Sequence, residues 1–181
     1  MKPGVQLNEL SDDLLAQLVL HALPDTEIHE VMAAVPGPTT WTPDRLQEFV
    51  SFHHRRRGGL DGPEGEVSFA ILVDGTASGV VRLQRVAPGH LEVGMWLTRS
   101  ARGRGIGGQV LESMASRAAV LGADKLVAIT TATNQAALSA LARIGATIHA
   151  PTSDGRVRTE VDLIKPTEAA NTVGTPIRDK N

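Results

Sequence analysis

The sequence predicts a single α/β domain in which helices flank a mixed, mostly antiparallel β-sheet. Three short apolar segments, residues 67–73, 77–86 and 91–97, follow one another closely, and turn signals at Asp74-Gly75 and Pro88-Gly89 separate them. Such spacing is typical of an antiparallel meander. A glycine-rich loop, an amphipathic helix and a further strand come next, and this order adds a strand–helix–strand unit to the meander.

The length and composition are those of one ordinary globular domain, with 181 residues of which 41% are hydrophobic and 21% charged. A formal net charge of -2 argues against general nucleic-acid binding. The absence of cysteine excludes disulfides and thiolate metal sites, and the six scattered histidines predict no metal site. Because no segment resembles a membrane span or a secretion signal, we expect no membrane association and a cytoplasmic protein.

The first part of the chain predicts one strand followed by two helices. Val5–Leu10 has the character of a short strand, and Ser11 is a suitable N-cap for the first helix, which ends at Pro24. Apolar residues recur in this helix at helical spacing: Leu14, Leu15, Leu18 and Val19. Thr42-Pro43-Asp44 opens the second helix, and the run His53-His54-Arg55-Arg56-Arg57 is interpreted as its solvated end.

The second half of the chain alternates helices and strands. A stripe of apolar residues from Ile106 to Leu121 predicts a helix that Gly122 ends. Lys125–Ile129 is apolar and β-branched, which indicates a strand. Asn134 is a suitable N-cap for a further helix, and Gly145 is well placed to end it.

A last hairpin closes the predicted domain. Residues 147–149 and 156–164 form its two strands, and Ser153-Asp154-Gly155 supplies the turn. We therefore assign residues 1–165 to the folded domain. Residues 166–181 are polar and aperiodic, and they predict a disordered tail.

Strand alternation assigns two faces to the segment 91–97. Glu92, Gly94 and Trp96 share one face, and the glycine leaves room there for a ligand. The residues of the other face are apolar and are expected in the core: Leu91, Val93, Met95 and Leu97.

The loop Arg102-Gly103-Arg104-Gly105-Ile106-Gly107 joins a strand directly to a helix and has the chemistry of a phosphate site. A helix N-terminus offers unpaired backbone N–H groups with partial positive charge, and glycines let an anion approach this backbone closely. The alternative is a connector whose glycines serve only a tight turn. Four glycines within the six residues 103–108 argue against it, because glycine adds conformational entropy to the unfolded chain.

Three phosphate-binding patterns compete for this loop. The dinucleotide pattern G-x-G-x-x-G is matched by Gly103, Gly105 and Gly108. However, the next strand lacks at its end the acidic residue that holds a ribose in that motif. A nucleotide P-loop is excluded, because Gln109 and Val110 stand where it needs lysine and serine or threonine. The third pattern, R/Q-x-x-G-x-G/A, is met by Arg102, Gly105 and Gly107.

With this third pattern, the chain resembles the GNAT superfamily of acetyl-CoA-dependent N-acetyltransferases over roughly Val67 to Ile164. The meander, the loop and the following helix and strand come in the order of that family. Asn134-Gln135-Ala136-Ala137 and Gly145-Ala146 are similar to its later helix, although the family usually has phenylalanine after the glycine. Glu92-Val93-Gly94-Met95-Trp96-Leu97 and Thr39-Thr40-Trp41-Thr42-Pro43 resemble the branch that acetylates the N-termini of ribosomal proteins.

The resemblance implies a set of cofactor-binding residues. Pyrophosphate contacts fall to the backbone N–H groups of Arg102, Gly103, Arg104, Gly105, Ile106 and Gly107. The two arginine side chains add positive charge. Trp96 and Leu97 lie near the pantetheine and the acetyl group, where a backbone N–H can stabilise an oxyanion. Asn134 contacts the cofactor, serves as a plain helix cap, or does both.

Acetyl transfer also requires proton transfers. Glu92 is the candidate general base, because it shares a face with the residue at the thioester end; the alternatives are attraction of a cationic acceptor and an exposed strand carboxylate without a role. The resemblance implies a tyrosine on the helix after Asn134 that protonates the leaving thiolate. The chain has no tyrosine, and Leu141 stands at that position. Ser139 is the nearest hydroxyl on this helix, and solvent is the other proton source.

The expected function is therefore transfer of an acetyl group from acetyl-CoA, the co-substrate, to a primary amine. A protein N-terminus and a small amine are both suitable acceptors. Two alternatives stay open at this point, a non-catalytic acyl-CoA-binding module and a dinucleotide-dependent oxidoreductase. A homodimer is also left open.

Overall fold

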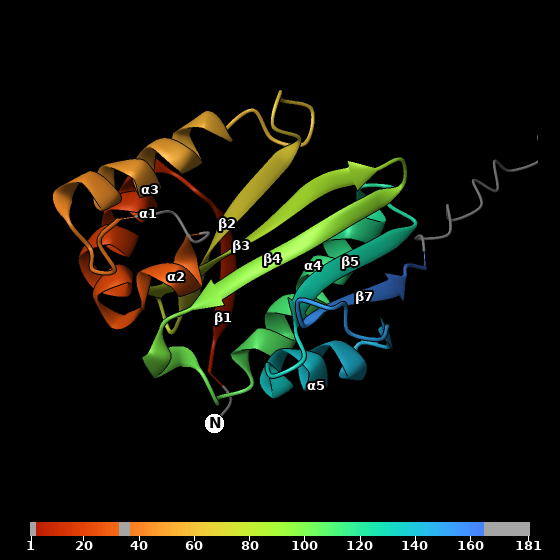
Figure 1. Ribbon diagram of the computed structural model, residues 1–181. Coiled ribbons are helices and arrows are strands. Elements are labelled where there is room, and N and C mark those ends of the chain that lie inside the picture. The colour runs from red at the N-terminus through yellow and green to blue at the C-terminus, as the bar shows by residue number, and fades with distance from the viewer. Residues whose placement is uncertain (1–2, 33–36, 165–181) are drawn as a thin grey trace, which may run out of the picture.

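The computed structural model of the protein describes residues 3–32 and 37–164, so the predicted tail after residue 165 lies outside the described residues. A seven-stranded sheet runs through the molecule in the order β1-β2-β3-β4-β5-β7-β6, with helices packed against it (Figure 1). Neighbours β4 and β5 pair in parallel, and the other five neighbouring pairs are antiparallel. The predicted mixed, mostly antiparallel sheet is confirmed.

The elements follow the predicted order closely. The strands are β1 Val5–Glu9, β2 Glu66–Val73, β3 Thr76–Ala87, β4 His90–Leu97, β5 Lys125–Thr131, β6 Thr147–Ile148 and β7 Arg156–Asp162. The helices are α1 Asp12–Gln17, the π-helical turn η1 Leu18–Ala22, the 3-10 turn η2 Leu23–Asp25, α2 Ile28–Val31, α3 Pro43–Arg55, the 3-10 turn η3 Arg99–Ala101, α4 Ile106–Val120 and α5 Gln135–Arg143.

Side-chain caps begin the helices where the sequence predicted them. Ser11 accepts a hydrogen bond from the Leu14 N–H, Thr42 caps α3, and Asn134 caps α5. The short helix α2 was not predicted, because four residues are too few to reveal a helical period. Glu27 and Glu30 form a capping box that begins it.

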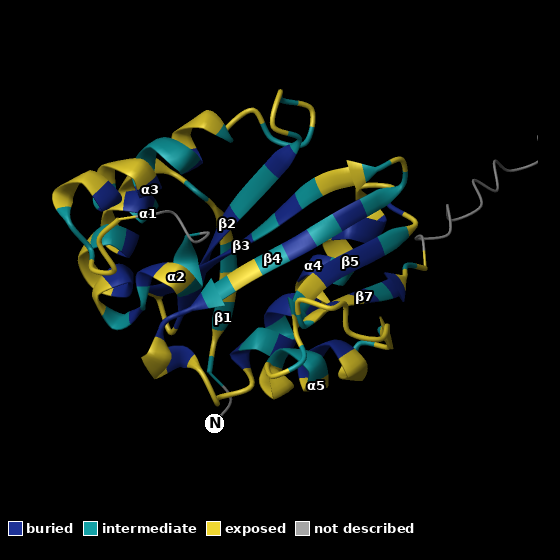
Figure 2. Cartoon of the chain, viewed as in Figure 1, coloured by how far each residue is buried: buried dark blue, intermediate teal, exposed yellow. Residues whose placement is uncertain are grey.

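Two apolar clusters hold helices to opposite faces of the sheet. The larger cluster joins the sheet to α4 and α5 and includes Phe69, Val81, Ile106, Met114 and Leu141. The smaller joins the other face to α1, η1 and α3 and includes Leu15, Leu18, Phe49, Ala77 and Val80. The buried segments follow the central strands and the inner sides of the helices (Figure 2).

Met95 corrects one expectation about the core. Its neighbours on the same face, Leu91, Val93 and Leu97, are buried as predicted. Met95 itself is 36% exposed. The reason lies in the sheet register, because the pairing of β5 with β4 ends at Glu92, before Met95 is reached.

His53 corrects a second expectation, since it lies inside the protein rather than at a solvated helix end. It is 7% exposed, and its ring packs edge-on against Phe49 and Phe52. Burial, helped by the nearby charges of Arg56 and His54, lowers the pKa of His53 from 6.5 to about 4. The neutral imidazole is therefore the stable form in the folded protein at neutral pH.

Acid should destabilise the protein through His53. Above pH 6.5 the imidazole is neutral in both the folded and the unfolded chain; as pH falls from 6.5 to about 4, the unfolded chain binds the proton first and stability falls. Replacing His53 with phenylalanine removes this proton uptake. Chemical unfolding at a series of pH values should therefore give a flatter stability profile for His53→Phe in this window. Parallel profiles for the two proteins would contradict the assignment.

Candidate active site

The strands β4 and β5 pair at one end only and leave a fork at the other. Their ladder consists of three residue pairs, of which Glu92 and Val127 are the last. We use "fork" for the region between Val93–Leu97 of β4 and Ala128–Thr131 of β5, where this ladder is absent. On its far side β5 stays paired with β7 as far as Thr131. The fork is therefore a built-in interruption of an otherwise continuous sheet.

Backbone N–H groups of β4 are directed into the fork. The N–H of Thr98 donates to the Ser78 carbonyl on the β3 side, 2.9 Å between N and O. Because successive residues of a strand point their N–H groups to opposite sides, those of Met95 and Leu97 point toward the fork. Within the part of the chain that the structure describes, no ladder partner stands opposite them. These groups are suited to bind a ligand that lies along β4.

The predicted phosphate loop presents further unpaired N–H groups. Gly103 and Gly105 have φ of 72° and 77°, the left-handed region that favours glycine, and Gly105 is the N-cap of α4 without a capping side chain. Among the described residues, no acceptor is recorded for the N–H groups of Gly103 to Gly108. Arg102 differs, because its N–H donates to the Arg99 carbonyl at 3.2 Å. The helix therefore begins with a run of open donors.

The loop and the fork adjoin each other. Ile106 is buried in the core and anchors the first turn of α4. A Cβ added at Gly107 would lie 3.5 Å from Met95 Cε and 4.0 Å from Leu97 Cδ1. The start of α4 therefore rests against the end of β4. A ligand with an anionic part and an acyl arm meets donors for both parts in one continuous region.

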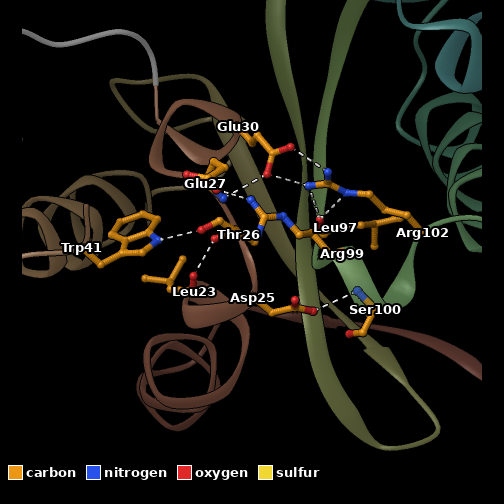
Figure 3. Close-up of polar contacts among 10 residues, drawn as sticks. All are labelled: Leu23, Asp25, Thr26, Glu27, Glu30, Trp41, Leu97, Arg99, Ser100 and Arg102. Atoms are coloured by element: carbon orange, nitrogen blue, oxygen red, sulfur yellow. Dashed lines mark hydrogen bonds and ion pairs between the residues drawn. The ribbon is translucent and has the colours of Figure 1, made fainter. Parts of the chain in front are cut away.

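The Arg102 side chain does not lie over the loop. Its Nε and Nη2 donate to the Leu97 carbonyl at 3.0 and 2.8 Å, and its Nη1 and Nη2 bind both oxygens of Glu30 at 2.6 and 2.9 Å (Figure 3). Arg104 is more exposed, and its Nη2 lies 3.6 Å from Asp74 Oδ2. The charge predicted from Arg102 is thus committed to protein groups in this structure.

The segment that carries Glu30 is fastened to the turn after β4 at two further points (Figure 3). The Ser100 N–H donates to Asp25 Oδ2 at 2.9 Å, and Arg99 pairs with Glu27. The sequence did not predict this set of three links, which we call the joint, because its two sides lie about seventy residues apart and α2 was not predicted. The joint ties the helical layer on one face of the sheet to the loop that leads into α4.

Glu30 should stabilise the protein over a wide pH range. The hydrogen bonds from Arg102 are the main cause that lowers the pKa of Glu30 from 4.5 to about 2. The contribution of ionised Glu30 to the free energy of unfolding is therefore complete above pH 4.5 and disappears as pH falls toward 2. Melting curves of the protein and of Glu30→Gln should differ at pH 7 and converge toward pH 2. A difference that stays constant with pH, or that is absent at pH 7, would contradict this interpretation.

Glu92 lies on the predicted face but in an unexpected setting. Its Oε1 accepts a hydrogen bond from Arg82 Nη2 at 3.2 Å, and Arg82 Nη1 also binds Gln84 at 2.8 Å. A Cβ added at Gly94 would come within 2.8 Å of Arg82 Nε. The expectation of open room above Gly94 is therefore wrong, because the Arg82 side chain fills it.

A buried carboxylate holds Arg82 in place. Glu66 is 1% exposed, and its Oε2 lies 3.3 Å from Arg82 Nη1 and 3.4 Å from Arg56 Nε. The sheet register brings Glu66, Gln84 and Glu92 side by side across β2, β3 and β4. No pattern within one segment predicted this cluster, because only the strand register brings its members together.

The remaining predicted residues, Trp96, Asn134 and Ser139, lie in three different surroundings. The Trp96 ring packs in the smaller apolar cluster, 6.2 Å from the Phe49 ring, on the α1–α3 face. Asn134 Oδ1 accepts from the Ala137 N–H at 3.1 Å, so the helix-cap role is confirmed. Ser139 is exposed, whereas Leu141 is buried in the core. The tyrosine position of the resemblance is thus filled by an apolar side chain.

Comparisons with known proteins agree with this architecture. Residues 5–147 match the family described as "Acetyltransferase (GNAT) domain". No curated protein matches the sequence. The chain is similar in structure to RimL, a ribosomal L7/L12 alpha-N-protein acetyltransferase solved with coenzyme A, with 17% identity, a TM-score of 0.67 and coverage of 88% of this chain and 94% of that one.

Two further solved structures share the fold. The Campylobacter jejuni N-acetyltransferase PseH in complex with acetyl coenzyme A is 14% identical, with a TM-score of 0.63 and coverage of 88% of this chain and 99% of that one. An N-acetyltransferase from Staphylococcus aureus Mu50 is 19% identical, with a TM-score of 0.67 and coverage of 89% and 99%. In the described residues there is no group of three or more side chains suited to hold a metal ion, and no helix suited to cross a membrane.

Proposed function

Since this chain belongs to the GNAT family of acetyltransferases and takes its acetyl group from acetyl-CoA, we propose that it transfers that group to a primary amine, either a protein N-terminus or a small amine. The observation that supports this proposal most is that two groups of backbone N–H donors lie next to each other. Open N–H groups at the start of α4 adjoin the N–H groups of Met95 and Leu97 in the fork. The dinucleotide alternative lacks a comparable ribose-binding acid.

We assign the pyrophosphate of acetyl-CoA to the N–H groups of Gly103, Arg104, Gly105, Ile106 and Gly107. Unpaired amides and the helix dipole both favour an anion there. The pantetheine arm lies in the fork and pairs with β4 as an additional strand would. The thioester carbonyl then accepts from a β4 N–H, which stabilises the oxyanion that forms during attack.

The reaction is direct transfer. The nitrogen of the neutral amine attacks the thioester carbon, a tetrahedral intermediate forms, and the carbon–sulfur bond then breaks. Glu92 Oε1 is held by Arg82, whereas Oε2 has no recorded partner among the described residues. Glu92 accepts the amine proton through Oε2, directly or through water.

The leaving thiolate takes its proton from a group other than tyrosine. Ser139 is our candidate on α5, because its hydroxyl is exposed while Leu141 offers no proton. Solvent is the alternative source, and a Ser139→Ala variant with unchanged kcat would assign the proton to solvent. Asn134 stays a proposed cofactor contact beside its cap role. The cytoplasmic location and a homodimer stay predictions.

The test combines the purified protein, acetyl-CoA and a panel of amines: peptides with free N-termini, amino acids and polyamines. The expected result is release of free coenzyme A thiol only when an acceptor is present, with a product heavier by one acetyl group in the mass spectrum. Tight acetyl-CoA binding without turnover on any amine would favour an acyl-CoA-binding module instead. Thermal stabilisation by NAD(H) and not by acetyl-CoA would favour the oxidoreductase.

A further inference from the structure

One of the three links between the α2 segment and the turn after β4 also reaches into β4. The link from Ser100 to Asp25 and the link from Arg99 to Glu27 connect the two segments only. Arg102 binds Glu30 and, with two of its nitrogens, the carbonyl oxygen of Leu97 (Figure 3). Leu97 is the last residue of β4 and borders the fork. Of the three links, this third one alone also holds the backbone of β4.

We propose that Arg102 is a positioning residue, which holds the backbone of Leu97 so that the Leu97 N–H faces the thioester, and that Glu30 holds Arg102 in the required orientation. This proposal rests on the acetyl transfer proposed above. It differs from a role of Arg102 as a direct phosphate contact, which the sequence pattern alone suggested.

The geometry supplies the physical reason. The peptide between Leu97 and Thr98 is held at both ends, by Arg102 on its C=O and by the Ser78 carbonyl on its N–H. In extended backbone the N–H and C=O of one residue point to the same side of the strand, so this peptide keeps the Leu97 N–H directed into the fork. An uncapped carbonyl oxygen beside the fork would oppose the negative charge that develops on the thioester oxygen. Two N–H donors at 3.0 and 2.8 Å neutralise that oxygen. The planar guanidinium serves Glu30 and Leu97 at once, which a lysine ammonium does less well.

Glu30 is held in a defined position of its own. Its Oε2 accepts from the Glu27 N–H at 3.0 Å, so the capping box of α2 aims the carboxylate at Arg102. The side chains of Glu30 and Arg102 are 26% and 40% exposed, which leaves the pair partly shielded from solvent. A change at Glu30 should therefore reach Leu97 through Arg102. Among the described residues, no hydrogen bond from Glu30 to β4 or to residues 103–107 is found.

Three variants separate positioning from direct phosphate binding and from a simple tether. They are Arg102→Met, Glu30→Gln and the matched control Arg99→Met, which removes the link to Glu27 without touching Leu97. Each variant is measured for kcat, for CoA affinity by calorimetry, and for the carbonyl-carbon and amide resonances of Leu97 by NMR.

Positioning predicts that Arg102→Met and Glu30→Gln lower kcat in the same direction, by about 10- to 100-fold for Arg102→Met, as expected for misplacement of a catalytic group. The double variant should be little worse than Arg102→Met alone, because both changes act on the backbone of Leu97 through the same guanidinium. Both changes should move the Leu97 carbonyl resonance and leave CoA affinity within about twofold. Arg99→Met should keep kcat and the Leu97 resonance.

Other outcomes overturn the proposal. If Arg102→Met weakens CoA binding while Glu30→Gln leaves or tightens it, Arg102 is a direct phosphate contact. If all three variants lower the melting temperature alike and keep kcat per folded molecule, the links are only structural. A wild-type protein that acetylates no amine would overturn the proposed function alone, because the Leu97 resonances still decide whether Arg102 and Glu30 orient the Leu97 backbone.

Discussion

Replacing Glu92 with glutamine is expected to lower kcat by about 100- to 10,000-fold, the usual contribution of general acid–base catalysis. The variant keeps the size of the side chain, and its amide oxygen can still accept the hydrogen bond that Arg82 donates to Glu92 Oε1 in the native protein. What it loses is the second carboxylate oxygen as a proton acceptor. Acetyl-CoA affinity should barely change, because Glu92 lies apart from the phosphate loop.

The pH–rate profile distinguishes the roles of Glu92. A general base predicts that the acidic limb of the profile moves or vanishes in Glu92→Gln, when chemistry limits the rate. Attraction of a cationic acceptor predicts a raised KM and an unchanged limb. Glu112→Gln is the matched control, because Glu112 is an exposed carboxylate on α4. Unchanged kcat, KM and pH profile in folded Glu92→Gln would remove Glu92 from the mechanism.

Replacing Gly105 with glutamate should weaken acetyl-CoA binding by about a hundredfold. A carboxylate about 5 Å from a pyrophosphate charge costs on the order of 3 kcal/mol at an effective dielectric constant near 20. The fold should survive, because a Cβ at Gly105 meets nothing within 4 Å. Calorimetric titration of the variant with acetyl-CoA measures the loss of affinity.

Gly122→Glu is the matched control for this experiment. Gly122 has φ of 83° against 77° for Gly105, and a Cβ there also meets nothing within 4 Å. It follows the opposite end of α4. The two variants therefore carry similar backbone strain and the same added charge, and only Gly105→Glu should lose affinity. Equal losses, or none in a folded Gly105→Glu, would move the pyrophosphate elsewhere.

Local chemistry explains the parts of the fold that the sequence predicted correctly. Ser11, Thr42 and Asn134 cap helices because a short polar side chain reaches the free N–H groups of the next turn. Asp74-Gly75 ends one strand and begins the next for a similarly local reason, since both residues adopt positive φ. The glycine loop before α4 belongs to this class as a structural element, because its glycines and the helix behind it are consecutive in the chain. Its role in binding the pyrophosphate stays a prediction.

Long-range geometry explains what the sequence missed. Met95 has the phase of a core residue, but the place where β5 leaves β4 decides its exposure. Arg102 stands at the arginine position of the phosphate-loop pattern, but Glu30, 72 residues away, decides where its guanidinium points. Arg82 fills the space above Gly94 only because β3 and β4 pair in one register. Neither register nor such pairings follow from spacing within one segment.

The most direct test of the cofactor site is a titration of the isotopically labelled protein with acetyl-CoA, followed by its backbone amide resonances. Binding in the loop and the fork predicts the largest shifts at Gly103, Gly105 and Gly107, together with Met95 and Leu97. The resonance of Gly122, which lies in the turn after the opposite end of α4, should stay in place. Saturable shifts confined to another surface, with the loop and the fork unchanged, would contradict the site proposed for acetyl-CoA.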